Sequence, residues 1–466
     1  MARWGLCVEE SAALGERLQE FYQGYAGYIR TTTRDTSQYG FHYLSGMLRM
    51  DTKRNMANIS RKTNQPEQNI HHFMSISPWS GRDLIEALQA DIGDSGTFAD
   101  SILIIDESAD EKSGQQTAGA GRQNNGRLGK VDLCQVGVFA SLATPQAHCW
   151  VDGELFIPEF WFASDQAARR KQVGIPETRT FQTKLDLALT LIRRCRDQTL
   201  PFTAVDMDSL YGRSFALRQT LQKEEIEYYA DIPASTHVHL HNPVIYYRTK
   251  KNGQPFKKPI IIGESVAVRE LVEHIDLESV HLTVRPSERG HIHDRFSRLP
   301  VWTEKEGQLI QEWLLIRHAA GKVTYVLSNA AADTPLAVMA TRKTPRYFIE
   351  RDNQDSKSEF GWDEFQATKY IAWEHQLAFT IMAAWFVTQS RLHWAEQHPQ
   401  DPELLKEYEV EALPQLSVGN VRELLRAAMP LPQLSPQEAN LLVIKHLKNR
   451  VRSRKSRLRK ASRARM

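Results

Sequence analysis

The chain has 466 residues, of which 41% are hydrophobic and 25% charged, and this predicts a globular protein of about two to four domains. Its net charge of +3 is unevenly distributed: residues 445–465 carry eleven Lys or Arg and no acid, and subtracting these leaves about −8 for the rest. Four cysteines without a CxxC pair indicate a reduced, cytoplasmic protein. The most apolar stretch, residues 377–387, is shorter than the ~20 residues of a membrane span, so we expect a buried helix and no membrane partner.

Residues 1–97 are predicted to be helical. Apolar side chains recur at helical spacing from Leu14 to Tyr25, and Ser80 is a candidate cap for a helix that ends near Ile92. A helix-turn-helix that binds DNA is one interpretation, and a plain helical bundle is the other. The first interpretation expects these basic side chains on exposed helix surfaces: Arg49, Lys53, Arg54, Arg61 and Lys62.

From residue 98 to residue 234, short apolar runs alternate with helical segments. The runs are SILIID, CQVGVFASLA, GELFIPEFWF, FTAVDMD and IEYYADIP, and helices are expected over 184–195 and 213–223. Three strands, a helix, a strand, a helix and a strand predict an α/β protein, with a mixed sheet that has helices on its faces. This order matches the first part of a ribonuclease H-like core.

A β-rich insertion is expected over residues 235–330. Strand-like runs flank Lys251-Asn252-Gly253, which is a hairpin signal, and a last strand, KVTYVLSN, returns to the core. Residues 331–395 are predicted to complete the core.

Residues 396–466 are predicted to form helices that end in the basic tail. A block of one charge sign stays solvated and suits a phosphate backbone, although the tail can also serve solubility alone. The first interpretation expects DNA contacts from Arg452, Arg454 and Lys455.

Two carboxylates follow apolar runs of the predicted core. Asp106 ends SILIID, and Asp208 follows FTAVDM, with Asp206 as a rival. At the tips of neighbouring strands, two carboxylates would repel unless a cation lay between them. Carboxylate oxygens are good ligands for magnesium, and two such ions cleave a phosphodiester bond by activating the nucleophile and stabilising the leaving oxygen. The alternative is that each aspartate only caps a turn or a helix.

A third carboxylate lies in TPRYFIERDNQDSKSEFG, a predicted helix with Thr344 as its N-cap and Pro345 at its first position. Glu350 follows Arg346 by four residues and Lys357 follows Glu350 by seven, so the three fall within about 40° on one helix face. This face is either a solvated salt-bridge stripe or a metal-binding glutamate between cations that hold DNA phosphates.

The residues that follow Asp106 resemble the region around the first aspartate in transposases of the insertion sequence 701 family. The pattern there is Asp, Lys-x-Gly, R-Q-x-x-G-x-x-G-K and C-Q-V-G-V, found here at Asp106, 112–114, 122–130 and 134–138. ELFIPEFW and the Asp-x-x-Tyr-Gly that starts at Asp208 also resemble that family. The resemblance extends from about residue 40 to residue 390.

The Glu350 segment is similar to the Y-x2-R-x3-E-x6-K signature of DDE transposases of insertion sequences. Lys343 stands where that signature has Tyr. The resemblance implies that Asp106, Asp208 and Glu350 form the catalytic, metal-binding triad, with two Mg²⁺ ions for which Mn²⁺ can substitute. It also implies DNA contacts from Arg346, Lys357, Arg122 and Lys130.

Such an enzyme would bind the terminal inverted repeats of its element through the N-terminal region and the tail, cleave them, and transfer the freed 3′-hydroxyl strands to target DNA. We expect it in the bacterial cytoplasm on the nucleoid, and as a homodimer on DNA because two ends must be paired. Two alternatives stay open: a metal-dependent DNA nuclease that never joins strands, and a DNA-binding protein without catalysis.

Overall fold

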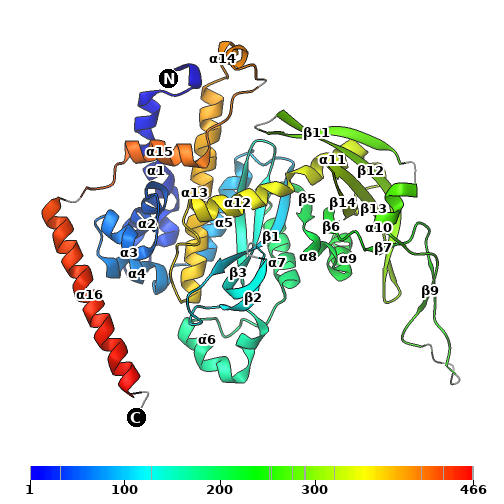
Figure 1. Ribbon diagram of the computed structural model, residues 1–466, viewed down its shortest axis with the longest axis horizontal. Coiled ribbons are helices and arrows are strands. Elements are labelled where there is room, and N and C mark those ends of the chain that lie inside the picture. The colour runs from blue at the N-terminus through cyan, green and yellow to red at the C-terminus, as the bar shows by residue number, and fades with distance from the viewer. Residues whose placement is uncertain are drawn as a thin grey trace.

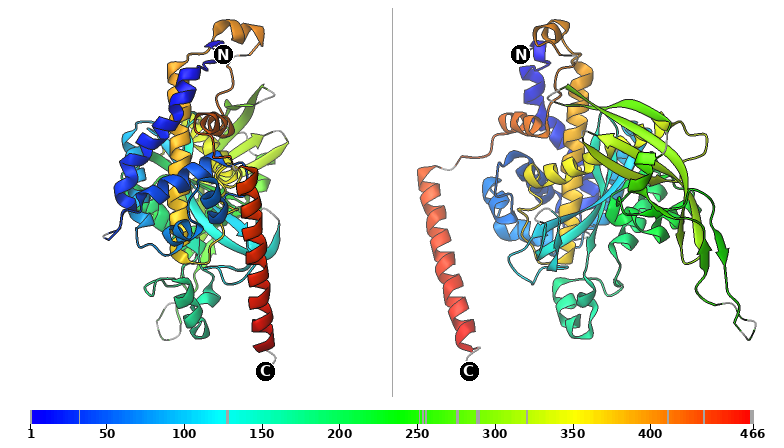
Figure 2. Two further views of the ribbon diagram at one scale, coloured as in Figure 1. Left: turned by 90° about the vertical axis from the view of Figure 1, so that its left-hand side faces the viewer. Right: turned by 45° about the vertical axis from the view of Figure 1, so that its right-hand side comes forward.

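The computed structural model describes residues 2–463, apart from 32, 127–128, 251, 253, 255, 275–276, 288–289, 320, 411 and 434. A ten-stranded sheet forms the centre of the molecule, with a helical body at one end (Figure 1). A two-stranded arm and a long C-terminal helix project from opposite sides of this centre (Figure 2).

The helical body contains the N-terminal region, as predicted. Ser80 accepts a hydrogen bond from the Asp83 backbone N–H and caps the fifth helix. The helices are α1 (Val8–Tyr25), α2 (Ser37–Arg49), α3 (Met56–Lys62), α4 (Glu67–Ser75) and α5 (Gly81–Asp94). The 28-residue helix α13 (Tyr370–Gln397) packs against α2, α4 and α5 and against the sheet. Residues 377–387 lie within α13 and are almost all buried, which confirms the predicted buried helix. No helix in the described part of the chain is long and apolar enough to cross a membrane.

Two of the basic side chains expected on exposed helix surfaces are instead buried. Arg49 donates to the backbone oxygens of Ser45 and Met429, at 3.2 and 2.8 Å. Arg54 is only 3% exposed and donates to Glu364. The expectation for these two was wrong because helical spacing does not distinguish a cation facing water from one that meets acceptors brought in by a distant segment.

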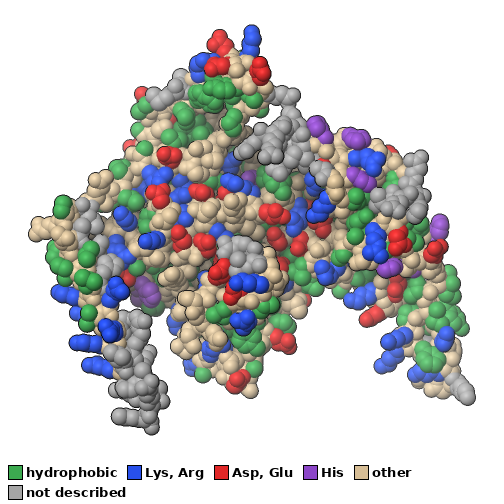
Figure 3. All heavy atoms as spheres, in the orientation of Figure 1, with side chains coloured by type: hydrophobic (Ala, Val, Ile, Leu, Met, Phe, Trp, Pro, Cys, Tyr) green, Lys and Arg blue, Asp and Glu red, His purple; other side chains and the backbone are tan. Residues whose placement is uncertain are grey.

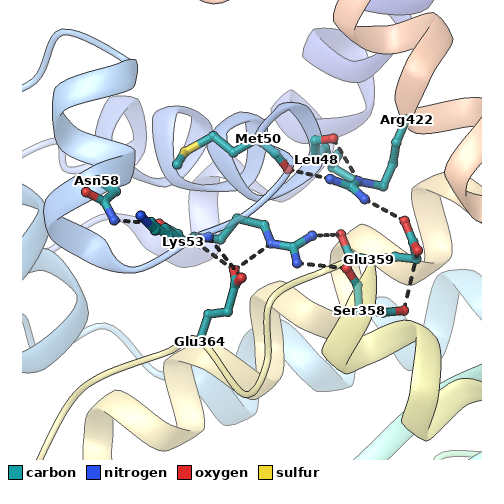
Figure 4. A network of polar contacts seen from close by, with 9 residues as sticks. Leu48, Met50, Lys53, Asn58, Ser358, Glu359, Glu364 and Arg422 are labelled. Atoms are coloured by element: carbon teal, nitrogen blue, oxygen red, sulfur yellow. Dashed lines mark hydrogen bonds and ion pairs between the residues drawn. The ribbon is translucent and has the colours of Figure 1, made fainter.

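The contacts of Arg54 belong to a joint between the N-terminal helices and residues 358–364, at the end of the Glu350 segment and just beyond it. The Arg54 guanidinium also donates to the backbone oxygens of Ser358 and Glu359, both at 2.7 Å. From the C-terminal side, Arg422 donates to the oxygens of Leu48 and Met50 and to the Glu359 carboxylate (Figure 4). Residues far apart in the sequence are therefore held together here by buried cations.

The sheet has the strand order β11-β12-β13-β14-β6-β5-β1-β3-β2, with β4 paired to β3. Its central strands are β1 (Ser101–Glu111), β2 (Gly121–Asn125), β3 (Lys130–Ala143), β4 (His148–Phe156), β5 (Phe202–Met207) and β6 (Tyr228–Ile232). β1 pairs antiparallel with β3 and parallel with β5, β3 pairs antiparallel with β4, and β5 pairs parallel with β6. The predicted mixed α/β sheet is confirmed.

Alternation along β1 separates the two faces of this sheet, since successive side chains of a strand point to opposite faces. Leu103 and Ile105 share a core with α7 (Lys184–Asp197), whereas Ile102 and Ile104 pack with α11 (Leu336–Lys343) and α12 (Tyr347–Ser358). The remaining helices of this part are α6 (Ala167–Val173), α8 (Ser209–Gly212) and α9 (Phe215–Lys223).

The segment expected to be β-rich contains four strands that extend the same sheet and two separate strand pairs. Its elements are β7 (His237–Val238), β8 (Val244–Tyr246), β9 (Ile260–Ile262), β10 (Val266–Ala267), α10 (Val268–His274), β11 (Ser279–Ser287), β12 (Gly290–Lys305), β13 (Gln308–Ala319) and β14 (Lys322–Ser328). β14 pairs with β6, so the predicted returning strand is confirmed. Asn252 of the predicted hairpin lies in a turn, whereas Lys251 and Gly253 lie outside the described residues.

The C-terminal helices are α14 (Pro402–Glu407), α15 (Val418–Ala428) and α16 (Pro436–Arg463). α15 packs against α1 and α2 in the helical body. α16 stands away from the sheet, and its apolar side chains, such as Leu441, Ile444 and Val451, are about half exposed (Figures 1 and 2).

Candidate active site

Four carboxylates lie on, or directly after, neighbouring strands of the sheet under α11 and α12. Asp106 follows the alternation of Ile102 and Ile104, which places it on the face that α12 covers. Asp206 lies on the same face of β5, Asp208 directly follows β5, and Asp231 lies on β6. Acidic side chains from three adjacent strands are thus gathered in one place.

The sequence predicted that the first core strand ends at Asp106, and this was wrong. β1 continues to Glu111 because it stays paired with β3. The last parallel pair between β1 and β5 is Ile105 with Met207. Asp106 is therefore the first residue of β1 beyond the end of β5. Its carboxylate interacts electrostatically with that of Asp208, where the chain leaves β5.

The Asp-x-x-Tyr-Gly motif shapes this exit from β5. Asp208 caps α8 by accepting from the backbone N–H groups of Leu210 and Tyr211, at 2.8 and 3.4 Å. The Tyr211 hydroxyl donates to Glu107 at 2.9 Å. Gly212 lies so close to β6 that an added Cβ would be 2.0 Å from the Asp231 backbone oxygen. The motif therefore fixes Asp208 at the end of β5, close to Glu107 of β1 and to Asp231 of β6.

Lys343 is the counter-ion of two of the acids. Its buried ammonium lies 2.6 Å from Asp206 Oδ1 and 2.9 Å from Asp231 Oδ1. Burial raises the pKa of Asp206 to about 7, the charge of Lys343 opposes this rise, and Asp231 adds to it. Asp231 was not expected from the sequence, and Lys343 was noted there only as a departure from the signature. Strand alternation from Tyr229 would have placed Asp231 on the Asp206 face.

Arg346 carries the second positive charge among the carboxylates. Its Nε lies 3.4 Å from Asp231 Oδ2, and its Nη1 lies 3.1 Å from Glu350 Oε1. Burial lowers the pKa of Arg346, but the negative charges of Asp106, Asp206, Asp231 and Asp208 outweigh burial and raise the pKa above its ordinary value. Arg346 therefore stays charged at the centre of this acidic group.

The pKa of Asp106 is affected by the same surroundings. Burial raises it to about 7, the charge of Arg346 opposes the rise, and the charges of Asp208 and Glu107 add to it. A carboxylate whose pKa is raised by an acidic neighbour is a common feature of sites where a cation or a shared proton lies between the two groups.

Glu350 lies in the first turn of α12, which begins two residues later than predicted. Thr344 is not the N-cap, because it follows α11 directly and its hydroxyl donates back to the Thr341 oxygen at 2.8 Å. Residues Thr344–Arg346 form a 3₁₀ turn, and Tyr347 starts the helix. The Glu350 side chain is 68% exposed and forms the i,i+4 ion pair with Arg346 that the salt-bridge interpretation expected.

The carboxylates meet part of what a divalent metal ion needs, which is several oxygen ligands at one place. Asp106 and Asp208 supply hard oxygen donors at one place, which fits such an ion. The Glu350 carboxylate is engaged by Arg346 instead. Among the described residues, no group of three or more His, Cys, Asp or Glu side chains is arranged to hold a metal.

The other residues expected to contact DNA are dispersed. The Lys357 ammonium, 13% exposed, donates to the Ala109 backbone oxygen at 2.8 Å and lies 3.4 Å from Asp110, so it ties α12 to β1. Lys130 is exposed and lies 3.1 Å from Asp132. Three further side chains are exposed on α16, namely Arg452, Arg454 and Lys455, and Arg122 is exposed on β2.

A second buried cluster on α12 was not expected from the sequence. Asp352 accepts from Ser141 and lies 2.6 Å from Nδ1 of His148, whose ring stacks on Phe348. These contacts hold α12 on β3 and β4 and so determine where Glu350 can reach.

Comparison with known proteins assigns the chain to a class. A family described as DDE superfamily endonuclease matches residues 21–289, which is more than half of the chain. The chain therefore belongs to the DDE superfamily endonucleases, whose enzymes use divalent metal ions. Asp106 and Asp208 lie within the matched residues, whereas Glu350 lies beyond them.

A similar protein is the probable transposase for insertion sequence element IS701 of Microchaete diplosiphon. It is 25% identical over 364 residues, which span 75% of this chain and 83% of the relative. The resemblance to insertion sequence 701 transposases and the DDE enzyme class, both expected from the sequence, are confirmed.

Proposed function

We propose that this protein is a DNA transposase that cleaves the ends of its element and transfers the 3′-hydroxyl strands to target DNA, with Asp106, Asp208 and Glu350 as metal ligands. The observation that carries the proposal is that Asp106, within β1, interacts electrostatically with Asp208 at the end of β5, in a chain that belongs to the DDE superfamily. The strand order β4-β3-β1-β5-β6 supports a ribonuclease H-like core.

Asp208 is a better second ligand than Asp206. The Asp206 carboxylate is fully buried and held by Lys343, whereas Asp208 is partly exposed. Glu350 would complete this set of ligands, because its exposed carboxylate can leave Arg346 and bind a metal ion. Two Mg²⁺ ions, or Mn²⁺ in their place, would supply the charge that activates water and the 3′-hydroxyl and stabilises the leaving oxygen. Arg346, freed from Glu350, then binds a phosphate beside the reacting strand.

DNA outside the site would be held by exposed cations. α16 presents Arg452, Arg454 and Lys455 to solvent on a helix that stands apart from the body. Lys53 and Lys62 remain exposed in the N-terminal region and are available for the element ends. Because two ends must be joined in one event, we propose a homodimer on DNA.

The test is excision and joining in the purified full-length protein. The donor is a plasmid that carries the coding sequence with its flanking DNA, and the target is a second plasmid. We expect joined products only with Mg²⁺ or Mn²⁺, and a loss of cleavage in Asp106→Asn, Asp208→Asn and Glu350→Gln. Asp333→Asn, an exposed carboxylate before α11, is the matched control and should retain activity.

Cleavage that survives in any of the three variants would remove that residue from the proposed triad. Metal-dependent cleavage without joined products would instead establish the nuclease alternative on the same residues. DNA binding without either reaction would establish the non-catalytic alternative.

A further inference from the structure

A two-stranded arm projects from the sheet into solvent. We define the arm as residues 244–262, which comprise β8, β9 and their connection (Figures 1 and 2). β8 and β9 pair antiparallel from Val244 with Ile262 to Tyr246 with Ile260. Backbone hydrogen bonds of 2.7 Å, from Phe256 N to Arg248 O and from Lys250 N to Gln254 O, continue the ribbon toward its tip.

The arm is basic and apolar at once. Its 19 residues contain five Lys or Arg and no Asp or Glu, whereas the chain outside the C-terminal tail is net acidic. The four basic residues that the structure describes, Arg248, Lys250, Lys257 and Lys258, are exposed. Tyr246, Tyr247 and Phe256 are each 42–52% exposed, and Figure 3 shows basic and hydrophobic side chains side by side on the arm.

No ion pair between described residues involves any of these four basic side chains. Lys250 lies 5.8 Å from the centre of the Phe256 ring, so even its contact inside the arm is with an aromatic face. The positive charge of the arm is therefore available to an outside anion.

The base of the arm is attached to the sheet. His239 and Trp302 exchange two backbone hydrogen bonds, of 2.9 and 2.8 Å, just before the arm begins. Gly307, in the turn between β12 and β13, lies against Tyr247 and Pro259, since an added Cβ would be 2.5 Å from the Tyr247 hydroxyl. The long strands of the sheet therefore direct the arm away from the body.

These features together are typical of an element that binds a polyanion. A two-stranded ribbon is only marginally stable by itself. We therefore expect its exposed aromatic side chains to pack against the surface of a partner. The major groove of DNA admits a two-stranded ribbon, and lysine and arginine on such a ribbon neutralise the phosphates that line the groove. An acidic protein would match the charge but offers no groove of this shape.

We infer that the arm inserts into the major groove of duplex DNA, with its basic side chains on the phosphates and its aromatic side chains on sugars and base edges. The inference rests on the proposed function only in that DNA is the substrate. It assigns to residues 244–262 a binding role separate from the carboxylate site and from α16.

The experiment measures the binding of a fluorescent mixed-sequence duplex of about 30 base pairs, close to three helical turns, over a series of salt concentrations. It uses the full chain in EDTA, so that no metal-dependent step contributes. The test variant carries Arg248→Gln, Lys250→Gln, Lys257→Gln and Lys258→Gln. The control removes the same charge from exposed lysines on other elements, through Lys171→Gln, Lys223→Gln, Lys322→Gln and Lys406→Gln.

Each phosphate contact contributes roughly 0.9 to the slope of log affinity against log salt concentration. We expect the test variant to lose about 2 to 4 units of slope and to bind more than tenfold more weakly at low salt, and the control to keep the wild-type slope. Phe256→Ala should weaken binding with the slope unchanged, because it removes contact without charge. Melting temperatures equal to wild type will show that the exposed substitutions leave the fold intact.

An unchanged slope and affinity in the test variant would overturn the inference, as would equal losses in test and control. A loss of self-association without a loss of DNA binding would also overturn it and assign the arm to a second copy of the chain. The outcome is independent of catalysis. A protein that binds the duplex through its arm but never cleaves would contradict the proposed function alone.

Discussion

The ammonium of Lys343 lies 2.6 Å from Asp206 Oδ1, and this pair joins the end of α11 to the middle of the sheet. Lys343 also reaches Asp231, so one cation compensates acids on two strands. This is the position at which the insertion-sequence signature has Tyr. In this chain it holds α11, and through the following 3₁₀ turn it sets the start of α12, which carries Arg346 and Glu350.

Lys343→Met should destabilise the protein by about 3 to 5 kcal/mol, because it keeps the length of the side chain but removes the ion-pair partner of the buried Asp206 carboxylate. Urea denaturation monitored by tryptophan fluorescence measures the change. Adding Asp206→Asn to Lys343→Met should recover part of the loss, because the amide needs no counter-ion. A loss below about 1 kcal/mol in the single variant would show that the pair contributes little.

The raised pKa of Asp106 predicts a pH dependence of stability in EDTA. The folded value of about 7 lies above the ordinary value of about 3.9, so between these pH values the folded protein binds more protons than the unfolded chain. Its stability therefore falls as pH rises through this range. Asp106→Asn removes this contribution, and the variant should gain about 1 to 4 kcal/mol relative to wild type between pH 4 and pH 8.

The measurement is the free energy of unfolding of both proteins at each pH. Comparing the two cancels other titrating groups, such as Asp206. Asp333→Asn, which changes an exposed carboxylate, should parallel wild type. A constant difference between Asp106→Asn and wild type across the range would contradict the raised pKa.

Arg54 should be far more important for stability than the neighbouring Lys53. Arg54→Met leaves two backbone oxygens without their donor and the Glu364 carboxylate with only its backbone donors, and we expect a loss of about 3 to 5 kcal/mol. The Lys53 side chain is exposed, so Lys53→Met should change stability by less than about 0.5 kcal/mol. Chemical denaturation of the two variants provides a matched comparison, and similar effects would mean that the joint is not stabilising.

Gly212→Ala tests whether the Asp-x-x-Tyr-Gly motif is required by packing. The added methyl group would overlap the Asp231 backbone oxygen, so α8 must move away from β6. Overpacking of this kind costs about 1 to 3 kcal/mol or more, and the shift should also lower cleavage because Asp208 moves with α8. The control is Gly24→Ala, because Gly24 lies in α1 with open space around it. Gly96→Ala is not suitable, because the φ of Gly96 is positive. Wild-type stability and cleavage in Gly212→Ala would contradict the packing argument.

Much of the fold was accessible from local patterns. Apolar runs of strand length and helical spacing depend only on neighbours in the chain, and they correctly placed α7, β5, β6 and the buried α13. The motif around Asp106 was enough to indicate the family, because its glycines and polar residues occupy a short continuous segment. This segment folds as β1, β2 and β3.

The partners of the charged side chains depended on the tertiary structure. Arg54 and Lys53 are adjacent and equally basic in the sequence, yet of these two side chains only that of Arg54 pairs with an acid, Glu364, which lies 310 residues away. Lys343 looks like a departure from a signature until β5 and β6 bring two acids to it. The amino-acid sequence by itself determined the strands, their two faces and the family. Only the folded chain decided which charges meet, because the electrostatic energy of an ion pair depends on distance and burial in space and not on separation along the chain.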